Sequence, residues 1–157
     1  MIWKTIRLGT GLKSVDDFYK ALKDGKFRFS DWASDILKKP AFKVADEETE
    51  IDLVKVTVAE LGFKDGARRD QIGKRAEELG LELCPAEVGP QLRLQYPDQP
   101  NGEWISVAIK PILDSDGRPR VFYVVCDDFG LRLDSRWRYP DYVWNAGHQW
   151  VFCRPRK

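Results

Sequence analysis

The stretch GLELCPAEVGPQLRLQY, residues 80–96, decides how the chain divides. Upstream of it, apolar residues recur mainly at helical spacing, whereas residues 92–96 alternate apolar and polar side chains as a strand does. Between the two patterns lies Gly89-Pro90, a dipeptide that predicts the end of a helical turn. We therefore expect a junction here, with a helical half over about 1–90 and a sheet half over about 91–157.

Upstream of the junction, local signals predict three helices. Ser14 is a typical N-cap in SVDDFYKALKDG, and Ser30 has the same role in SDWASDILKKP. The third helix lies in RRDQIGKRAEELGLEL and ends before Gly80, which suits a left-handed C-cap. A strand over DLVKVTV, residues 52–58, is expected between the second and third helices, and the pair Thr57 and Glu60 predicts that it continues into one helical turn.

Downstream of the junction, the sequence is typical of strands. Four runs are rich in β-branched and aromatic residues: EWISVAIKPI, RVFYVVCDD, GLRLDSRWRY and QWVFCR. Tight turns between them predict consecutive hairpins. We expect a single α+β domain over 1–157, with N-terminal helices packed on one face of a C-terminal antiparallel β-sheet, a meander of about four to five strands.

Composition places the chain among ordinary globular proteins. Its 157 residues are 43% hydrophobic and 32% charged, which suits one domain with its own core. No apolar run approaches the roughly 18 residues of a membrane span, and the N-terminus lacks a secretory pattern. We expect a cytoplasmic protein with no membrane partner.

The cysteines offer two chemical alternatives, both weak. Cys84, held extended by Pro85, with His148 as base, is the one possible thiol–imidazole pair for an enzyme. A zinc site would need Cys84, Cys126, Cys153 and His148 to converge from distant positions. Because no local spacing supports either alternative, we expect no metal and no cofactor.

The strongest candidate surface is a cluster of aromatic and basic side chains near the C-terminus. Stacking rings interleaved with guanidinium groups are suited to sugar rings or single-stranded nucleic acid. A simpler interpretation buries the rings in the core and leaves the arginines in solvent. The candidate binding residues are Arg132, Arg136, Trp137, Arg138, Tyr139, Tyr142, Trp144 and His148.

Nucleic-acid binding by a winged helix is an alternative function. The balance of charge is positive over 1–43 (ten basic against five acidic residues) and over 118–157 (eight against four), with an acidic middle. A recognition helix would have to begin near Pro85, where Gly89-Pro90 is expected to interrupt it. We therefore rank this alternative below a general binding module.

The chain also resembles a group of short hypothetical proteins predicted from genomes of uncultured bacteria. The likeness lies in the phrases LGTGLK, DWASDILKKPAF, LGLELCPAEVGPQLRLQY and the closing WVFCR. It extends over nearly the whole chain and implies a bacterial family, but it brings no activity, ligand or site residue with it. The sequence thus predicts a small non-enzymatic binding or interaction module whose partner is a protein or a nucleic acid.

Overall fold

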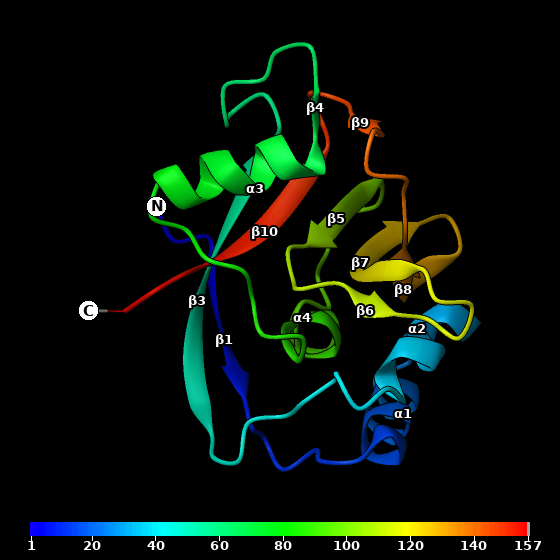
Figure 1. Ribbon diagram of the computed structural model, residues 1–157. Helices are drawn as coiled ribbons and strands as arrows, with labels where there is room; N and C mark the ends of the chain where they lie inside the picture. Colours follow the sequence, from blue (N-terminus) through cyan, green and yellow to red (C-terminus); the bar gives the residue numbers. More distant parts are fainter. Residues whose placement is uncertain (157) are drawn as a thin grey trace.

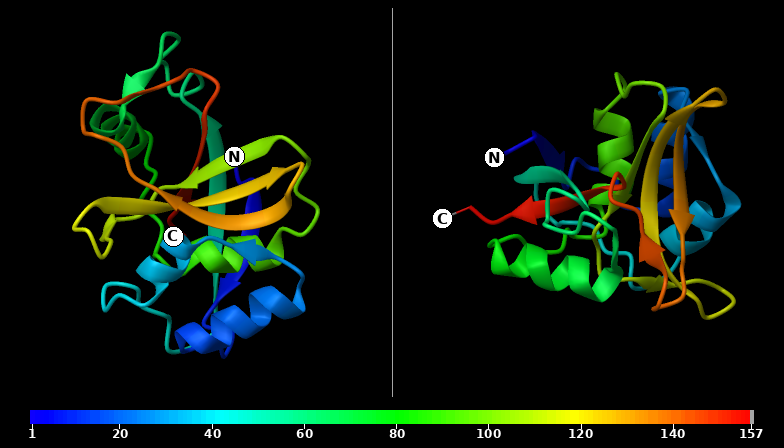
Figure 2. Two further views of the ribbon diagram at one scale, coloured as in Figure 1. Left: turned by 90° about the vertical axis from the view of Figure 1, so that its right-hand side faces the viewer. Right: turned by 90° about the horizontal axis from the view of Figure 1, so that it is seen from above.

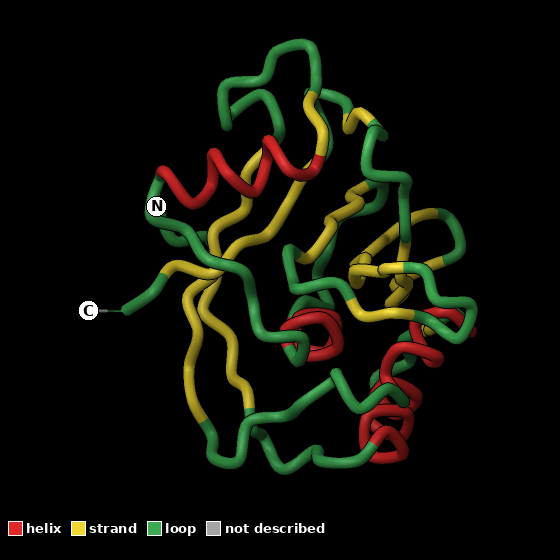
Figure 3. Tube along the Cα trace, viewed as in Figure 1, coloured by secondary structure: helices red, strands yellow, loops and turns green. Residues whose placement is uncertain are grey.

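The computed structural model describes residues 1–156 and shows helices and strands mixed along the chain (Figures 1 and 3). The helices are α1 (Val15–Asp24), α2 (Asp31–Leu37), α3 (Arg69–Glu78) and α4 (Val88–Gln95). The strands are β1 (Lys4–Leu8), β2 (Arg28–Phe29), β3 (Thr49–Thr57), β4 (Ala67–Arg68), β5 (Glu103–Val107), β6 (Ile112–Leu113), β7 (Pro119–Asp127), β8 (Gly130–Arg136), β9 (Val143–Trp144) and β10 (Gln149–Arg154). None of these helices has the length and apolar character needed to cross a membrane.

Local sequence signals produce the three expected helices. The Ser14 hydroxyl accepts a hydrogen bond from the Asp17 amide, and the Asp17 carboxylate accepts one from the Ser14 amide, a reciprocal cap that starts α1. Ser30 caps α2 in the same way through the amide of Ala33. Gly80 follows α3 with φ +81°, the left-handed conformation expected at that position.

The sheet is larger than predicted and is mixed. Its strand order is β1-β3-β10-β5-β7-β8-β2, with β6 on β7, while β4 and β9 form a separate pair. The hairpin of β7 and β8 and the antiparallel pairing of β5 with β7 confirm part of the meander. However, β10 lies between β3 and β5, antiparallel to the former and parallel to the latter. Because β1, β2 and β3 belong to the same sheet, the prediction of a helical half and a separate sheet half is wrong.

The segment expected to form a strand over residues 92–96 is instead the C-terminal part of α4. Pro90 is the third residue of this helix, where a backbone N–H has no intrahelical partner, so proline removes nothing. Glu87, Gln91 and Gln95 lie one turn apart and are linked side chain to side chain, at 3.0 and 2.9 Å. The helix is buried along Val88–Arg93, which is why its apolar residues show no amphipathic spacing.

The helices cover both faces of the sheet rather than one. Ser106 pairs with Tyr123 and with Trp150, so these three side chains share a face and Phe122 points to the other. Helix α4 packs on the Phe122 side, where α1 contacts α4 and α2 contacts β8. Helix α3 borders Phe152, on the side of Trp150. In the right-hand view of Figure 2, β10 accordingly separates α3 from α4.

Candidate functional site

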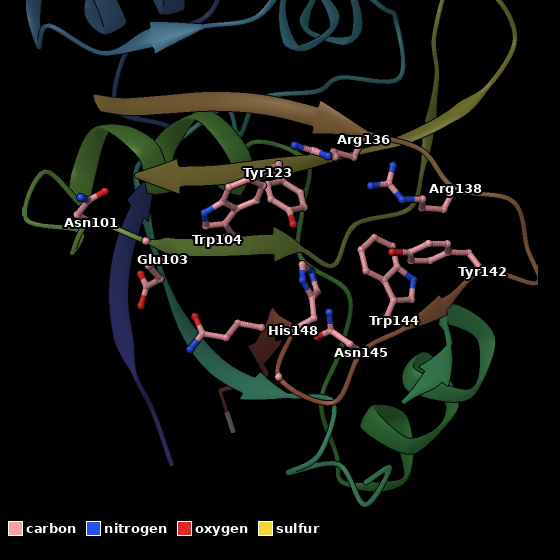
Figure 4. A pocket seen from close by; sticks show the side chains of 13 residues that line it. Asn101, Glu103, Trp104, Tyr123, Arg136, Arg138, Tyr142, Trp144, Asn145 and His148 are labelled. Atoms are coloured by element: carbon pink, nitrogen blue, oxygen red, sulfur yellow. The ribbon is translucent and has the colours of Figure 1, made fainter. Parts of the chain in front are cut away.

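A cleft of about 580 Å³ opens on the sheet face that α4 does not cover. One wall is the outer surface of β5, β7 and β8, and the other is the segment 142–149, which includes β9 (Figure 4). Such a volume suits a small organic ligand. We name it the aromatic–arginine cleft. Its rings are Trp104, Tyr123, Tyr142, Trp144 and His148. Its other polar side chains are Asn101, Glu103, Arg136, Arg138, Asn145 and Gln149.

The pairing register of the sheet brings one wall together. Val125 lies opposite Trp104 and Val121 lies opposite Arg136, and both valines are an even number of residues from Tyr123. Because alternate residues of a strand share a face, Trp104, Tyr123 and Arg136 project into the same space from three strands. Figure 4 shows these side chains side by side above the sheet.

The opposite wall is held by the two-stranded sheet and by ring packing. Trp144 pairs with Ala67 of β4 through the backbone, and its ring lies edge-on to Trp150, with centroids 5.1 Å apart. The Tyr142 ring lies 5.0 Å from that of Trp144. Trp144 and Trp150 are buried, whereas Tyr142 is 39% exposed. The wall therefore combines a fixed base with an accessible ring.

Two guanidinium groups give the cleft its positive charge. The Arg136 Cζ atom lies 4.9 Å from the ring centroid of Tyr123 and 5.5 Å from that of Trp104. The Arg138 Cζ atom lies 5.1 Å from the centroid of Tyr142. Neither guanidinium forms an ion pair with a carboxylate among residues 1–156.

The only carboxylate that lines the cleft within the described chain is already occupied. Glu103 accepts from the Lys55 ammonium at 2.8 Å and from the Tyr96 hydroxyl at 2.8 Å. Its charge is compensated by these partners, so the positive charge of the arginines is left without a counter-ion inside the cleft.

His148 is neutral at physiological pH because of its surroundings. Burial and then the positive charges of Arg138 and Arg136 lower its pKa to about 4. Its Nε2 atom lies 2.8 Å from the Ser106 hydroxyl. Ser106 is fully buried, so it serves to orient the imidazole and is not accessible to a ligand.

Tyr123 presents a polar group to the cleft. Its side chain is only 5% exposed, and its hydroxyl makes no hydrogen bond to another described residue. Figure 4 shows the hydroxyl pointing between the sheet and Arg138. Burial raises the pKa of Tyr123, while Arg136 and Arg138 oppose the shift. The phenol is therefore a neutral donor with no partner.

Five of the eight predicted binding residues line this cleft: Arg136, Arg138, Tyr142, Trp144 and His148. Trp137 and Tyr139 line a neighbouring apolar hollow instead. Arg132 is paired with Asp127 at 2.7 Å. Sequence reasoning missed Trp104 and Tyr123, because only the pairing of β5, β7 and β8 places them beside the arginines.

The residues of the other two alternatives lie elsewhere. Cys84 is buried, its thiol donates to the Val151 carbonyl at 3.6 Å, and burial raises its pKa well above the usual value. Among residues 1–156, no group of three or more histidine, cysteine or carboxylate side chains is arranged to hold a metal ion. The segment considered as a recognition helix corresponds to α4, whose buried side chains cannot enter a groove of DNA.

Comparison of the chain with protein-family models, with curated proteins and with solved structures gives no match.

Proposed function

We propose that this protein is a non-enzymatic binding module whose ligand occupies the aromatic–arginine cleft. The ligand combines a negative charge with a planar ring. The observation that carries the proposal is the placement of Arg136 and Arg138 over aromatic rings, in a cleft where no described carboxylate neutralises them. An anion supplies the missing counter-ion, and its ring stacks on the rings that remain exposed.

Binding is favoured over catalysis by the state of the nucleophiles. Ser106 contacts the imidazole of His148, but its hydroxyl is fully buried below the histidine and does not face the cleft. Cys84 is buried against the backbone of β10, and its raised pKa keeps it a thiol. Neither side chain has the accessible, activated form that covalent catalysis needs.

The proposal is tested by quenching of tryptophan fluorescence, since Trp104 is 39% exposed in the cleft. The probes are AMP, phenyl phosphate and 4-hydroxybenzoate, with adenosine and phenol as their uncharged analogues. We expect the anions to bind more tightly than the analogues. Arg136→Gln and Arg138→Gln should each weaken binding by about tenfold or more, because each removes a charged donor worth about 1.5–3 kcal/mol.

Arg132→Gln is the matched control. Arg132 lies on the same strand and the same face as Arg136, but its guanidinium is paired with Asp127 outside the cleft. It should bind the probes as the wild type does. No response to any ring-bearing anion, or an equal loss in the control variant, would contradict the proposal.

Nucleic-acid binding remains the second candidate because the same rings and arginines could stack and pair with a single strand. A strand that neutralises several phosphates on the protein would bind with a steep dependence on salt. Quenching by a single-stranded oligonucleotide with no such dependence excludes this version.

A further inference from the structure

Five side chains of the cleft form a continuous arc. Arg136 lies 4.9 Å from the Tyr123 centroid, and the rings of Tyr123 and His148 are 5.7 Å apart. The ring of His148 lies 4.7 Å from that of Trp144, over which the Arg138 Cζ sits at 5.8 Å. Both cations are thus at the two ends of an arc whose middle holds a phenol and an imidazole.

The donors of this arc outnumber the acceptors of a carboxylate. A single guanidinium can satisfy both oxygens of a carboxylate in a bidentate pair. Here two guanidinium groups, the Tyr123 hydroxyl and an imidazole nitrogen border one space. A phosphate monoester has three terminal oxygens and about two negative charges, so it can use all four groups. The donor set therefore favours phosphate over carboxylate.

The rest of the cleft offers groups suited to a heterocycle and hydroxyls. Trp104 and Tyr142 are each 39% exposed, so their ring faces are accessible. The side-chain amides of Asn101, Asn145 and Gln149 lie along the lining, and the Gln149 Oε1 atom is buried with no hydrogen-bond partner. An orphaned acceptor of this kind is satisfied by an N–H or O–H of a ligand.

We infer that the cleft is a nucleoside monophosphate site, with the phosphate between Arg136 and Arg138 and the base against Trp104 and Tyr142. The Tyr123 hydroxyl donates to the phosphate, and the amide groups contact the base or the ribose. This inference rests on the proposed function and narrows its ligand class. The nucleotide is either free or the 5′-terminal nucleotide of a single strand, since both present the same phosphate and ring.

Isothermal titration calorimetry with AMP, GMP, CMP and UMP tests the inference. Each titration is matched by the corresponding nucleoside, by inorganic phosphate and by phenyl phosphate. We expect at least one nucleotide to bind ten times more tightly than its nucleoside and than either phosphate control. Arg136→Gln, Arg138→Gln and Tyr123→Phe should each reduce this difference, whereas Arg132→Gln should preserve it. Circular dichroism of each variant shows whether the fold is intact.

The outcomes separate the inference from the proposed function. If phenyl phosphate or 4-hydroxybenzoate binds and depends on Arg136, but nucleotides bind no better than nucleosides, the inference fails and the proposed function stands. If no ring-bearing anion binds, both fail.

A 5′-phosphorylated pentanucleotide distinguishes the two sources. Binding that needs the terminal phosphate supports the inference and assigns the site to strand ends, whereas preference for the free nucleotide supports it and assigns the site to small molecules. Binding of the pentanucleotide with or without its terminal phosphate overturns it.

Discussion

The contact between α4 and β7 can be tested by adding one carbon atom. Gly89 lies in the first turn of α4, directly against the buried ring of Phe122. A Cβ atom at this position would stand 2.8 Å from the Phe122 Cβ and closer still to two of its ring atoms. The optimal separation of two carbon atoms is about 3.5–4.0 Å. The ring cannot retreat freely, because it is fully buried and packs edge-on against Phe42.

Two effects of opposite sign set the expected magnitude for Gly89→Ala. Alanine in a helix is favoured over glycine by about 1 kcal/mol. Overpacking of a close-packed core costs about 1–3 kcal/mol and occasionally more, and the short contacts place this site at the upper end. We expect a net loss of about 2 kcal/mol in the free energy of unfolding. For a chain of this size, that loss corresponds to a melting temperature lower by about 4–8 °C.

Gly73→Ala in α3 is the matched control. A Cβ atom there would meet no heavy atom within 4 Å, and Gly73 has no positive φ. This variant should therefore be more stable than the wild type, by up to about 1 kcal/mol. Urea denaturation followed by circular dichroism measures both variants. If Gly89→Ala is as stable as the wild type, or if the two variants change in the same direction, α4 does not pack on Phe122 as described.

Three further results are expected. Stability should fall between about pH 6.5 and 4, because the pKa of His148, about 4 when folded, lies below its unfolded value and the unfolded chain takes up the proton first; urea midpoints should show a loss on the order of 3 kcal/mol, absent in His148→Gln, and an equal slope in that variant would contradict the assignment. Arg120→Met should destabilise the protein by about 3–5 kcal/mol, because it strands the buried Asp114 carboxylate 2.6 Å from the lost guanidinium; urea denaturation at pH 7 measures this, and a loss below about 1 kcal/mol would contradict it. In the native protein, iodoacetamide should modify Cys84 more slowly than the partly exposed Cys126, as followed by peptide mass spectrometry; equal rates would mean that Cys84 is accessible.

Helix ends could be predicted from the sequence because their determinants are local. The caps at Ser14 and Ser30 and the left-handed Gly80 each depend on residues within one turn. The turn after β3 is similar, since Thr57 and Glu60 exchange the two expected hydrogen bonds, at 2.8 and 3.0 Å. In these places three or four neighbouring residues determine the conformation, whatever the rest of the chain does.

Helix α4 could not be predicted because its stability comes from distant groups. Arg93 alternates with leucines and is expected on a wet face, yet it is fully buried. Its guanidinium donates to the carbonyls of Tyr96, Val125 and Arg132 and to the side chain of Gln99, at 2.6–3.2 Å. Burial lowers the pKa of Arg93 to about 10. Only the assembled sheet provides these acceptors, so the alternation of polar and apolar residues gave the wrong period.

The cleft combines both kinds of information. The aromatic and basic residues between positions 136 and 148 are visible in the sequence, but the other wall depends on the insertion of β10 between β3 and β5. That insertion sets Gln149 beside Ile105 and Trp150 beside Ser106. His148 therefore reaches the Ser106 hydroxyl and faces Tyr123. Because parallel pairing of distant strands leaves no local signature, the residues of one wall could be identified from the sequence, whereas the ring opposite them could not.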